Sequence, residues 1–492
     1  MNFPKLSPEE AVADICHGDT ISFSGFSPAG GAKSVPLALA ARARKKHEQE
    51  KPFKVRVLTG ASSGRCIDED LARAEAVSWR APYQSGDTLR RQINRQEVEY
   101  VDHHLSHVPQ MVTEGFFGGI RMAVVEATEI TSDGRIYLTT SIGASPTYLR
   151  HADQVVIEIN QGQSQRLREF ADIYTMPLPP HRTPIPIYEP LNRIGVPYAT
   201  VDPRKVIGIV ETNEPDAVPD FSGSDEISRG IAENVVEFLL NEMRAGRIPP
   251  TLLPLQAGAG NVANSVMAAL GANPDIPGFC MYSEVCQNAM IDLMIQNKIR
   301  GISACSLTVT AAKLREIVDN MDFFASRIVL RPQEISNHPG VIRRLGVIAL
   351  NTALELDIYG NVNSSHICGT HIVNGIGGSG EFTRNSYLSI FMTPSTAKGG
   401  KVSAVVPMCP HIDNNEHSVQ IVVTEQGLAD LRGLGPLRRA KTIIDNCAHP
   451  RYRDYLHQYI REAPLGHIPH DLTRCFEMHR NFIQYGDMLP EG

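Results

Sequence analysis

The sequence lacks the features that mark secreted, membrane-spanning and nucleic-acid-binding proteins. Its nine cysteines include no C-x-x-C pair, so no disulfide framework is expected. No apolar run approaches the ~20 residues that span a bilayer, and no signal peptide is visible at the N-terminus. The net charge is only −7, without a long block of one sign. We therefore expect a cytoplasmic protein that binds neither membranes nor nucleic acid.

Patterns for metals and for hydrolytic triads are missing as well. Histidines cluster at residues 103–107 and recur at His411 and His417, but they join no cysteines or acids at ligand spacing. No Ser-His-Asp signature is visible. We expect no metal site and no tightly bound cofactor.

Length and breaker residues indicate two domains. A chain of 492 residues with 42% hydrophobic content can bury more than one core. Prolines are too dense for regular structure at residues 177–190, and a second breaker-rich stretch spans residues 214–225. We place the boundary in the second stretch, which predicts domains at residues 1–224 and 225–492.

The first half alternates strand and helix patterns. Ser7, Pro8 and Glu10 form a capping-box start for a helix that runs toward residue 18, and residues 35–46 favour a second helix. Strands are predicted at residues 21–24, 55–58, 123–126, 155–159 and 206–210. Their wide spacing leaves room for crossover helices, so a largely parallel sheet is expected.

The second half repeats this βα rhythm. Helices are predicted at residues 231–240, 261–270 and 285–294, and strands at residues 252–255, 279–282, 347–350, 402–406 and 419–423. The expected fold class is therefore α/β, with two tandem open α/β domains whose sheets are largely parallel.

Glu284 is the leading candidate for chemistry. It follows the strand pattern of residues 279–282, and the carboxyl end of a strand is where open α/β proteins bind ligands. A glutamate is ionised at neutral pH and can attack a thioester carbonyl without a general base. The simpler interpretation is a solvated acid in the first turn of the following helix.

Two glycine-rich turns in the same half could supply backbone N–H donors to a developing negative charge. The turn at residues 374–380 (NGIGGSG) is either such a nest or a flexible loop. The turn at residues 258–263 (GAGNVA) has two further interpretations. With Glu284 about 20 residues on, it matches a relaxed dinucleotide fingerprint and so predicts an oxidoreductase, or its glycines only make a tight turn.

Four other residues are further candidates, and two of them, Asn337 and Glu425, stand where elements end. Asn337 and Glu425 have the pattern of cap or turn residues. Lys398 is typical of an exposed turn, with a phosphate contact as the sharper alternative. Arg80 is one candidate cation for a dicarboxylate, although nothing in the sequence selects it.

Four ordered motifs carry a family resemblance: FSGFSPAG at residues 23–30, QAGAGN at residues 256–261, MYSEV at residues 281–285 and NGIGGSG at residues 374–380. Over nearly its whole length the chain resembles the acetyl-CoA hydrolase/transferase family of class I CoA-transferases. The resemblance implies a homodimer that moves coenzyme A between an acyl-CoA, such as propionyl-CoA or succinyl-CoA, and a carboxylate, such as succinate, propionate or acetate.

The resemblance also assigns roles. Glu284 matches the nucleophile that forms a mixed anhydride and then a glutamyl-CoA thioester. Asn337 matches an oxyanion-stabilising amide, Gly378 an oxyanion-hole N–H, and Glu425 an acid that helps to position the site. The segments that match coenzyme A contacts are Ala259, Gly260, Asn261, Val262, Ala263, Asn374, Gly378 and Lys398. The family's usual turn has valine at the position of Ala259, and Ser24-Gly25-Phe26 with Gly30 resembles its N-terminal pocket wall.

Three alternatives remain open from the sequence. A thioesterase would use the same glutamate with water as acceptor, a nicotinamide-dependent oxidoreductase would bind its cofactor at the glycine turn, and a non-catalytic subunit would bind coenzyme A without reacting. The sequence does not name the carboxylate pair.

Overall fold

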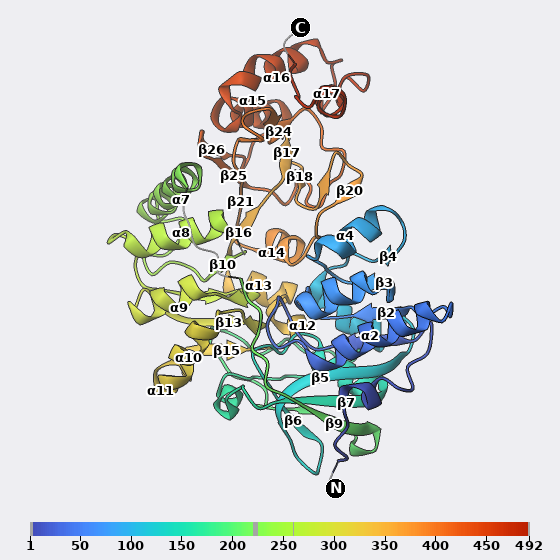
Figure 1. Cartoon of the computed structure of the whole chain (residues 1–492). Coiled ribbons are helices and arrows are strands. Elements are labelled where there is room, and N and C mark those ends of the chain that lie inside the picture. Colours follow the sequence, from blue (N-terminus) through green and yellow to red (C-terminus); the bar gives the residue numbers. More distant parts are fainter. Residues whose placement is uncertain (1–2, 220–224, 259, 491–492) are drawn as a thin grey trace.

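The computed structural model describes residues 3–219, 225–258 and 260–490, and it shows one large sheet in each half of the chain (Figure 1). In the first half, β1 is central and neighbouring strands are parallel from β4 to β9. The strands in spatial order are β4 (Glu99–Tyr100), β3 (Val77–Ala81), β2 (Val55–Leu58), β1 (Thr20–Phe23), β5 (Ile120–Ile130), β7 (Ala152–Asn160) and β9 (Val206–Thr212). The long β5 also pairs with antiparallel β6 (Arg135–Leu138), which pairs with β8 (Ala199–Thr200).

The second sheet has eight strands, and only its last pair is antiparallel. Its spatial order is β15 (Ile328–Leu330), β13 (Ile299–Ala304), β11 (Phe279–Tyr282), β10 (Leu255–Ala257), β16 (Ile348–Thr352), β21 (Leu388–Met392), β25 (Ile421–Thr424) and β26 (Gly427–Asp430). The expected α/β class with largely parallel sheets is confirmed.

Helices cover the sheets because their apolar faces and the strand side chains bury one another. The longer ones in the first half and at the start of the second are α2 (Ser34–Glu48), α4 (Asp87–Asn94), α7 (Glu226–Arg244), α8 (Asn261–Ala272), α9 (Asn288–Ile295) and α10 (Ala311–Asp319). Shorter helices near the site are α12 (Gln333–Ser336), α13 (Pro339–Leu345) and α14 (Ser379–Asn385). At the C-terminal end, α15 (Pro436–Cys447), α16 (Pro450–Glu462) and α17 (Glu477–Tyr485) pack into a separate apolar cluster with small strands (Figure 1).

Several predicted elements differ from the observed ones. The capping box at Ser7 is present, but its helix α1 (Pro8–Ala11) is only four residues long. The predicted strand at residues 402–406 is two short strands in two small sheets, β23 (Val402–Ser403) and β24 (Val405–Val406). Most importantly, the helix predicted at residues 285–294 is present as α9, but its predicted start directly after Glu284 is wrong: β12 (Val285–Cys286) comes first and pairs with β14 (Ser306–Leu307). Apolar runs this short do not distinguish strand from helix.

The stretch between β9 and α7 contains no helix or strand among its described residues, and residues 220–224 lie outside them. Asp216 fixes the start of this stretch to the first domain, because its carboxylate accepts from Gly30 N at 3.1 Å and lies 3.0 Å from Lys33 Nζ. Lys33 also pairs with buried Glu126. The boundary at residue 224 stays a prediction.

Arg331, directly after β15, connects the two halves. Its side chain is fully buried and forms an ion pair with Asp172 of the first half. It also donates to Ser303 Oγ at 2.7 Å and to the carbonyl oxygens of Pro190 and Asn192 at 3.1 and 2.5 Å. The proline-rich stretch is thus attached to the edge of the second sheet.

Arg331→Ala is expected to lower the free energy of unfolding by about 3–5 kcal/mol, because it leaves the buried Asp172 carboxylate without its cation. Urea unfolding followed by circular dichroism measures the change. Arg44→Ala, which removes an exposed arginine on α2, is the matched control and should leave the midpoint unchanged. Equal midpoints for the two variants would contradict this role.

Candidate active site

The carboxyl ends of the two parallel sheets face each other across a cavity of about 220 Å³. From the first sheet, loops after β1, β2 and β3 contribute Phe26, Ser27, Ala61 and Tyr83. From the second sheet, residues at or after the ends of β10, β11 and β16 contribute Gly258, Glu284, Val285, Asn351 and Thr352. The strand order of the second sheet reverses at β10, and such switch points are where open sheets bind ligands.

Glu284 points into this cavity. Its residue is half-buried, and its Oε1 accepts a hydrogen bond from Asn337 Nδ2 at 2.7 Å. Burial raises the pKa of the Glu284 carboxyl to about 7, although the Asn337 hydrogen bond acts in the opposite direction. The interpretation of Glu284 as a solvated acid in a helix's first turn is therefore wrong.

The backbone of Gly378 packs against the same carboxyl group. A Cβ atom built on Gly378 would lie 2.0 Å from Glu284 Oε1 and 2.2 Å from its carboxyl carbon. Space rather than backbone conformation requires glycine here, because its φ is −88°. The flexible-loop interpretation of residues 374–380 does not describe the observed contact, since this turn lines the cavity and packs on the candidate nucleophile.

Asn337 ends α12, as a cap or turn residue would, but its side chain is fully buried in the site. Besides contacting Glu284, its Nδ2 donates to Glu381 Oε2 at 2.9 Å. Glu381 is buried and its other oxygen accepts from Ser106 N at 2.6 Å. Sequence reasoning missed Glu381. The available signal was an acid just after the glycine-rich turn, which is also an ordinary position for a helix-start residue.

The glycine turn after β10 contributes one cavity residue, Gly258. Gly260 precedes α8 with φ at +119°, a conformation that disfavours other residues. Asn261, Val262 and Ala263 form the first turn of α8, and Asn261 is exposed. Ala259 lies outside the described residues.

Asn374 lines the cavity, and Phe26 of the expected N-terminal wall does so too. Glu425 and Lys398 do not belong to the residues that line it. Glu425 follows β25, where its carboxylate accepts from Ser395 N at 2.9 Å. Lys398 is exposed on the hairpin between β22 (Thr396–Ala397) and β23, with its Nζ 4.7 Å from the ring centre of Phe482.

Arg80 does not act as a free cation in the site. Its side chain is fully buried, its Nη2 lies 3.0 Å from Asp68 Oδ1, and it also donates to the carbonyl oxygens of Ala61 and Ala81. A guanidinium saturated in this way supports the loop after β2 and is not available to a substrate carboxylate.

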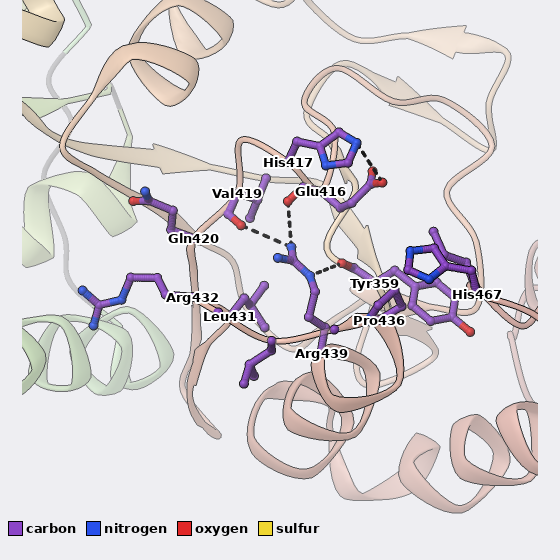
Figure 2. A pocket seen from close by; sticks show the side chains of 14 residues that line it. Tyr359, Glu416, His417, Val419, Gln420, Leu431, Arg432, Pro436, Arg439 and His467 are labelled. Atoms are coloured by element: carbon purple, nitrogen blue, oxygen red, sulfur yellow. Dashed lines mark hydrogen bonds and ion pairs between the residues drawn. The ribbon is translucent and has the colours of Figure 1, made fainter.

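A larger hollow of about 520 Å³ lies in the C-terminal region (Figure 2). Arg439, one of the two arginines in its lining, donates to the carbonyl oxygens of Tyr359, Glu416 and Val419 at 2.7, 2.9 and 3.2 Å (Figure 2). It borders the start of β25, which is the amino edge of the second sheet and opposite to the Glu284 edge. Position and chemistry therefore favour the Glu284 cavity as the reactive site.

Two features are absent from the described residues of the chain. Within residues 3–219, 225–258 and 260–490, no group of three or more histidine, cysteine and acidic side chains is arranged to hold a metal ion. Over the same ranges no helix is long and apolar enough to cross a bilayer.

Comparison with known proteins agrees with this architecture. A 4-hydroxybutyrate CoA-transferase from Porphyromonas gingivalis shares the fold with a TM-score of 0.62 at 21% identity, covering 93% of this chain and 97% of its own. A RipA mutant structure gives a TM-score of 0.74 at 22% identity, with 92% and 96% coverage. At these identities the likeness concerns the fold alone.

Sequence relatives are much closer. The chain is 56% identical to the propanoyl-CoA:succinate CoA transferase of Escherichia coli K12 over 99% of both chains. It is 43% identical to the succinyl-CoA:acetate CoA-transferase of Clostridium kluyveri, over 98% of this chain and 91% of the relative. It is 40% identical to the acetyl-CoA hydrolase of Schizosaccharomyces pombe, over 98% and 95%.

Family models give the same result in two segments. Residues 1–211 match the acetyl-CoA hydrolase/transferase N-terminal domain, and residues 314–460 match the corresponding C-terminal domain. With sheets, cavity and relatives in agreement, the chain belongs to the acetyl-CoA hydrolase/transferase family.

Proposed function

We propose that this protein is a CoA-transferase that carries coenzyme A between an acyl-CoA and a carboxylate on Glu284. One observation carries the proposal: the Glu284 carboxyl faces the cavity between the sheets, packed against Gly378 and hydrogen-bonded to Asn337. A carboxylate with amide donors beside it has the components of acyl transfer, namely a nucleophile and hydrogen bonds for the charge that develops.

The reaction follows from these groups. A Glu284 oxygen attacks the thioester carbonyl, and the carbon–sulfur bond breaks, which releases the CoA thiolate and forms a mixed anhydride between the acyl group and Glu284. The thiolate then attacks the glutamyl carbonyl, which releases the first acyl group as a carboxylate and leaves a glutamyl-CoA thioester. A second carboxylate reverses these steps. Asn337 Nδ2 stabilises the charge on the glutamyl side, and the Gly378 N–H is assigned to the oxyanion.

The names of the relatives support small acyl-CoA thioesters and small carboxylates as the substrates. The propanoyl, succinyl and acetyl groups in them are small acyl groups, and a cavity of about 220 Å³ suits an acyl group of this size beside the thioester. We assign propionyl-CoA or succinyl-CoA as donor and succinate, propionate or acetate as acceptor.

Coenzyme A is assigned to the second-domain side of the cavity. Asn374 and Gly378 line that side, and the start of α8, with Gly260, Asn261, Val262 and Ala263, begins two residues after Gly258. Lys398 is assigned a phosphate contact, which its exposed position on the hairpin permits. Glu425 is assigned a positioning role near Ser395. The proposal also includes a homodimer, whose mass light scattering would measure, and a cytoplasmic location.

Hydrolysis is the second candidate, because fungal relatives are named acetyl-CoA hydrolases. The two functions differ only in what attacks the glutamyl-CoA thioester, a carboxylate or water. Release of free coenzyme A without an added carboxylate, at a rate matching transfer, would favour hydrolysis.

Glu284→Ala is expected to abolish transfer with the fold intact, and Glu284→Asp to fail because its carboxylate retreats by one methylene. Intact mass after mixing with acyl-CoA alone should show a coenzyme A adduct on the wild type and on neither variant. Wild-type turnover by either variant would refute the assignment.

Gly378→Ala is expected to displace the Glu284 carboxyl, because the new Cβ would lie 2.0 Å from its Oε1. Transfer should fall by about 100-fold, as for loss of an oxyanion donor, with little change in thermal midpoint. Gly119→Ala is the control, since its Cβ would meet nothing within 4 Å. Equal turnover by both variants would remove Gly378 from the site.

The rate of transfer is expected to fall as pH falls through about 7. With its pKa raised to about 7, the Glu284 carboxyl becomes protonated below that pH and can no longer act as a nucleophile. Asn337→Ala removes the hydrogen bond that favours the charged form, so it should move this limb to higher pH and slow transfer by about 10²–10³-fold, as for loss of one oxyanion donor. Initial rates from about pH 5 to about pH 9 give the profile. A rate that stays flat down to the ordinary glutamate pKa of about 4.3 would contradict it.

A further inference from the structure

Glu381 lies behind the candidate nucleophile with no access to the cavity. It is 4% exposed and it is absent from the cavity lining. Its Oε1 accepts from Ser106 N at 2.6 Å, and its Oε2 accepts from Asn337 Nδ2 at 2.9 Å. The same Asn337 nitrogen donates to Glu284 Oε1 at 2.7 Å. One amide therefore bridges two carboxyl groups.

The bridge leaves one orientation for the Asn337 amide. Its nitrogen carries two hydrogens, and each is directed to one carboxyl group. Its buried Oδ1 has no hydrogen-bond partner among the described residues. The orientation of the amide is therefore set by the partners of its nitrogen. If the amide turned over, Oδ1 would face both carboxyl groups and would meet acceptors instead of donors. While Glu381 accepts through Oε2, it gives the N–H edge of Asn337 a second partner and so favours the orientation in which that edge faces Glu284.

We propose that Glu381 is a positioning residue that holds the N–H edge of Asn337 toward Glu284. This inference rests on the proposed role of Glu284 as the nucleophile. Glu381 does not touch the substrate, and acts only through the amide between the two acids. Glu381 lies one helical turn after Gly378. The same turn of α14 therefore supplies both the glycine that packs on Glu284 and the acid that contacts Asn337.

Glu381 is itself fixed from the opposite half of the chain. Ser106 belongs to the short helix η2 (Leu105–His107), and Leu105 lines the cavity. The carbonyl oxygen of Leu105 accepts from buried Gln333 Nε2 at 2.7 Å, and Gln333 begins α12, the helix that ends at Asn337. The orientation of the nucleophile thus depends on the packing of one half against the other.

Three titratable groups near the pair, Tyr83, Cys305 and His104, are neutral near pH 7, whereas Asp102, which accepts from Ile376 N, has a pKa of about 6 and is mostly ionised there. Burial raises the pKa of Tyr83 to about 12 and holds that of Cys305 well above its usual range. Burial lowers the pKa of His104, which lies against Gly380. Burial raises the pKa of Glu381 to about 8, against the hydrogen bonds from Ser106 and Asn337. The charge of Glu284 also raises the pKa of Glu381, as the smallest of its causes.

Glu381→Gln tests the proposal, because the side chain keeps its size but has one acceptor oxygen instead of two. If that oxygen takes the Ser106 N–H, the new NH₂ faces Asn337 and turns its amide over, so that Oδ1 meets Glu284. We expect kcat for transfer to fall about tenfold or more. The acid limb of the pH profile should move to higher pH, and KM for the acyl-CoA should stay nearly constant.

Glu355→Gln is the matched control. Glu355 is also buried, at 7% exposed, and its carboxylate accepts from Asn363 Nδ2 at 2.8 Å and contacts His479 Nε2 at 2.9 Å. It belongs to β17 (Glu355–Asp357) in a small sheet, away from the cavity lining. This variant should lose thermal stability while its kcat and acid limb remain those of the wild type.

An acid limb and kcat for Glu381→Gln equal to those of Glu355→Gln would overturn the positioning role, whatever the change in thermal midpoint. Should Glu381→Gln fail to fold, Glu381→Asp takes its place, since it keeps two acceptor oxygens at a shorter reach. A smaller shift of the acid limb in the same direction supports the proposal, and an unshifted limb overturns it. Residual transfer by Glu284→Ala would instead show that the nucleophile is misassigned.

Discussion

The hydrogen bond between Asn337 and Glu284 is the interaction around which the site is organised. A half-buried carboxylate that faces a cavity loses part of its hydration, and its charged form persists only where hydrogen-bond donors replace the lost water. Asn337 supplies one donor at 2.7 Å, while burial still raises the pKa to about 7. The result is a carboxylate that is more basic than an exposed glutamate and yet substantially ionised at neutral pH.

The two sheets create the conditions for this interaction. Parallel strands all end at one edge, and each half of the chain presents that edge to the other across the cavity. Loops from six strands therefore meet in one place, although they come from positions as far apart in sequence as Phe26 and Thr352. Buried contacts such as Arg331 with Asp172 hold the halves at this distance, so stability of the interface and geometry of the site are coupled.

Much of the chemistry could be read from the order of residues. The strand at residues 279–282 has the bounds that its apolar run predicted, and Glu284 lies at its carboxyl end. The glycine-rich turn at residues 374–380 lines the cavity between the sheets, which is the arrangement that a backbone nest would need. The family assignment agrees with the motifs that carried the resemblance, and it removes the support for a dinucleotide site at Gly258.

Local pattern and tertiary contact determined different properties of this protein. Periodicity and breakers predict where strands end, because backbone geometry and apolar spacing are local, and so the sequence by itself placed a carboxylate at a sheet edge. It could not show that Glu381 supports Asn337, that Arg80 is occupied by Asp68, or that Lys398 lies against Phe482. Those facts depend on segments brought together by the packing of two sheets, and burial, pKa and hydrogen-bond partners exist only once that packing is complete.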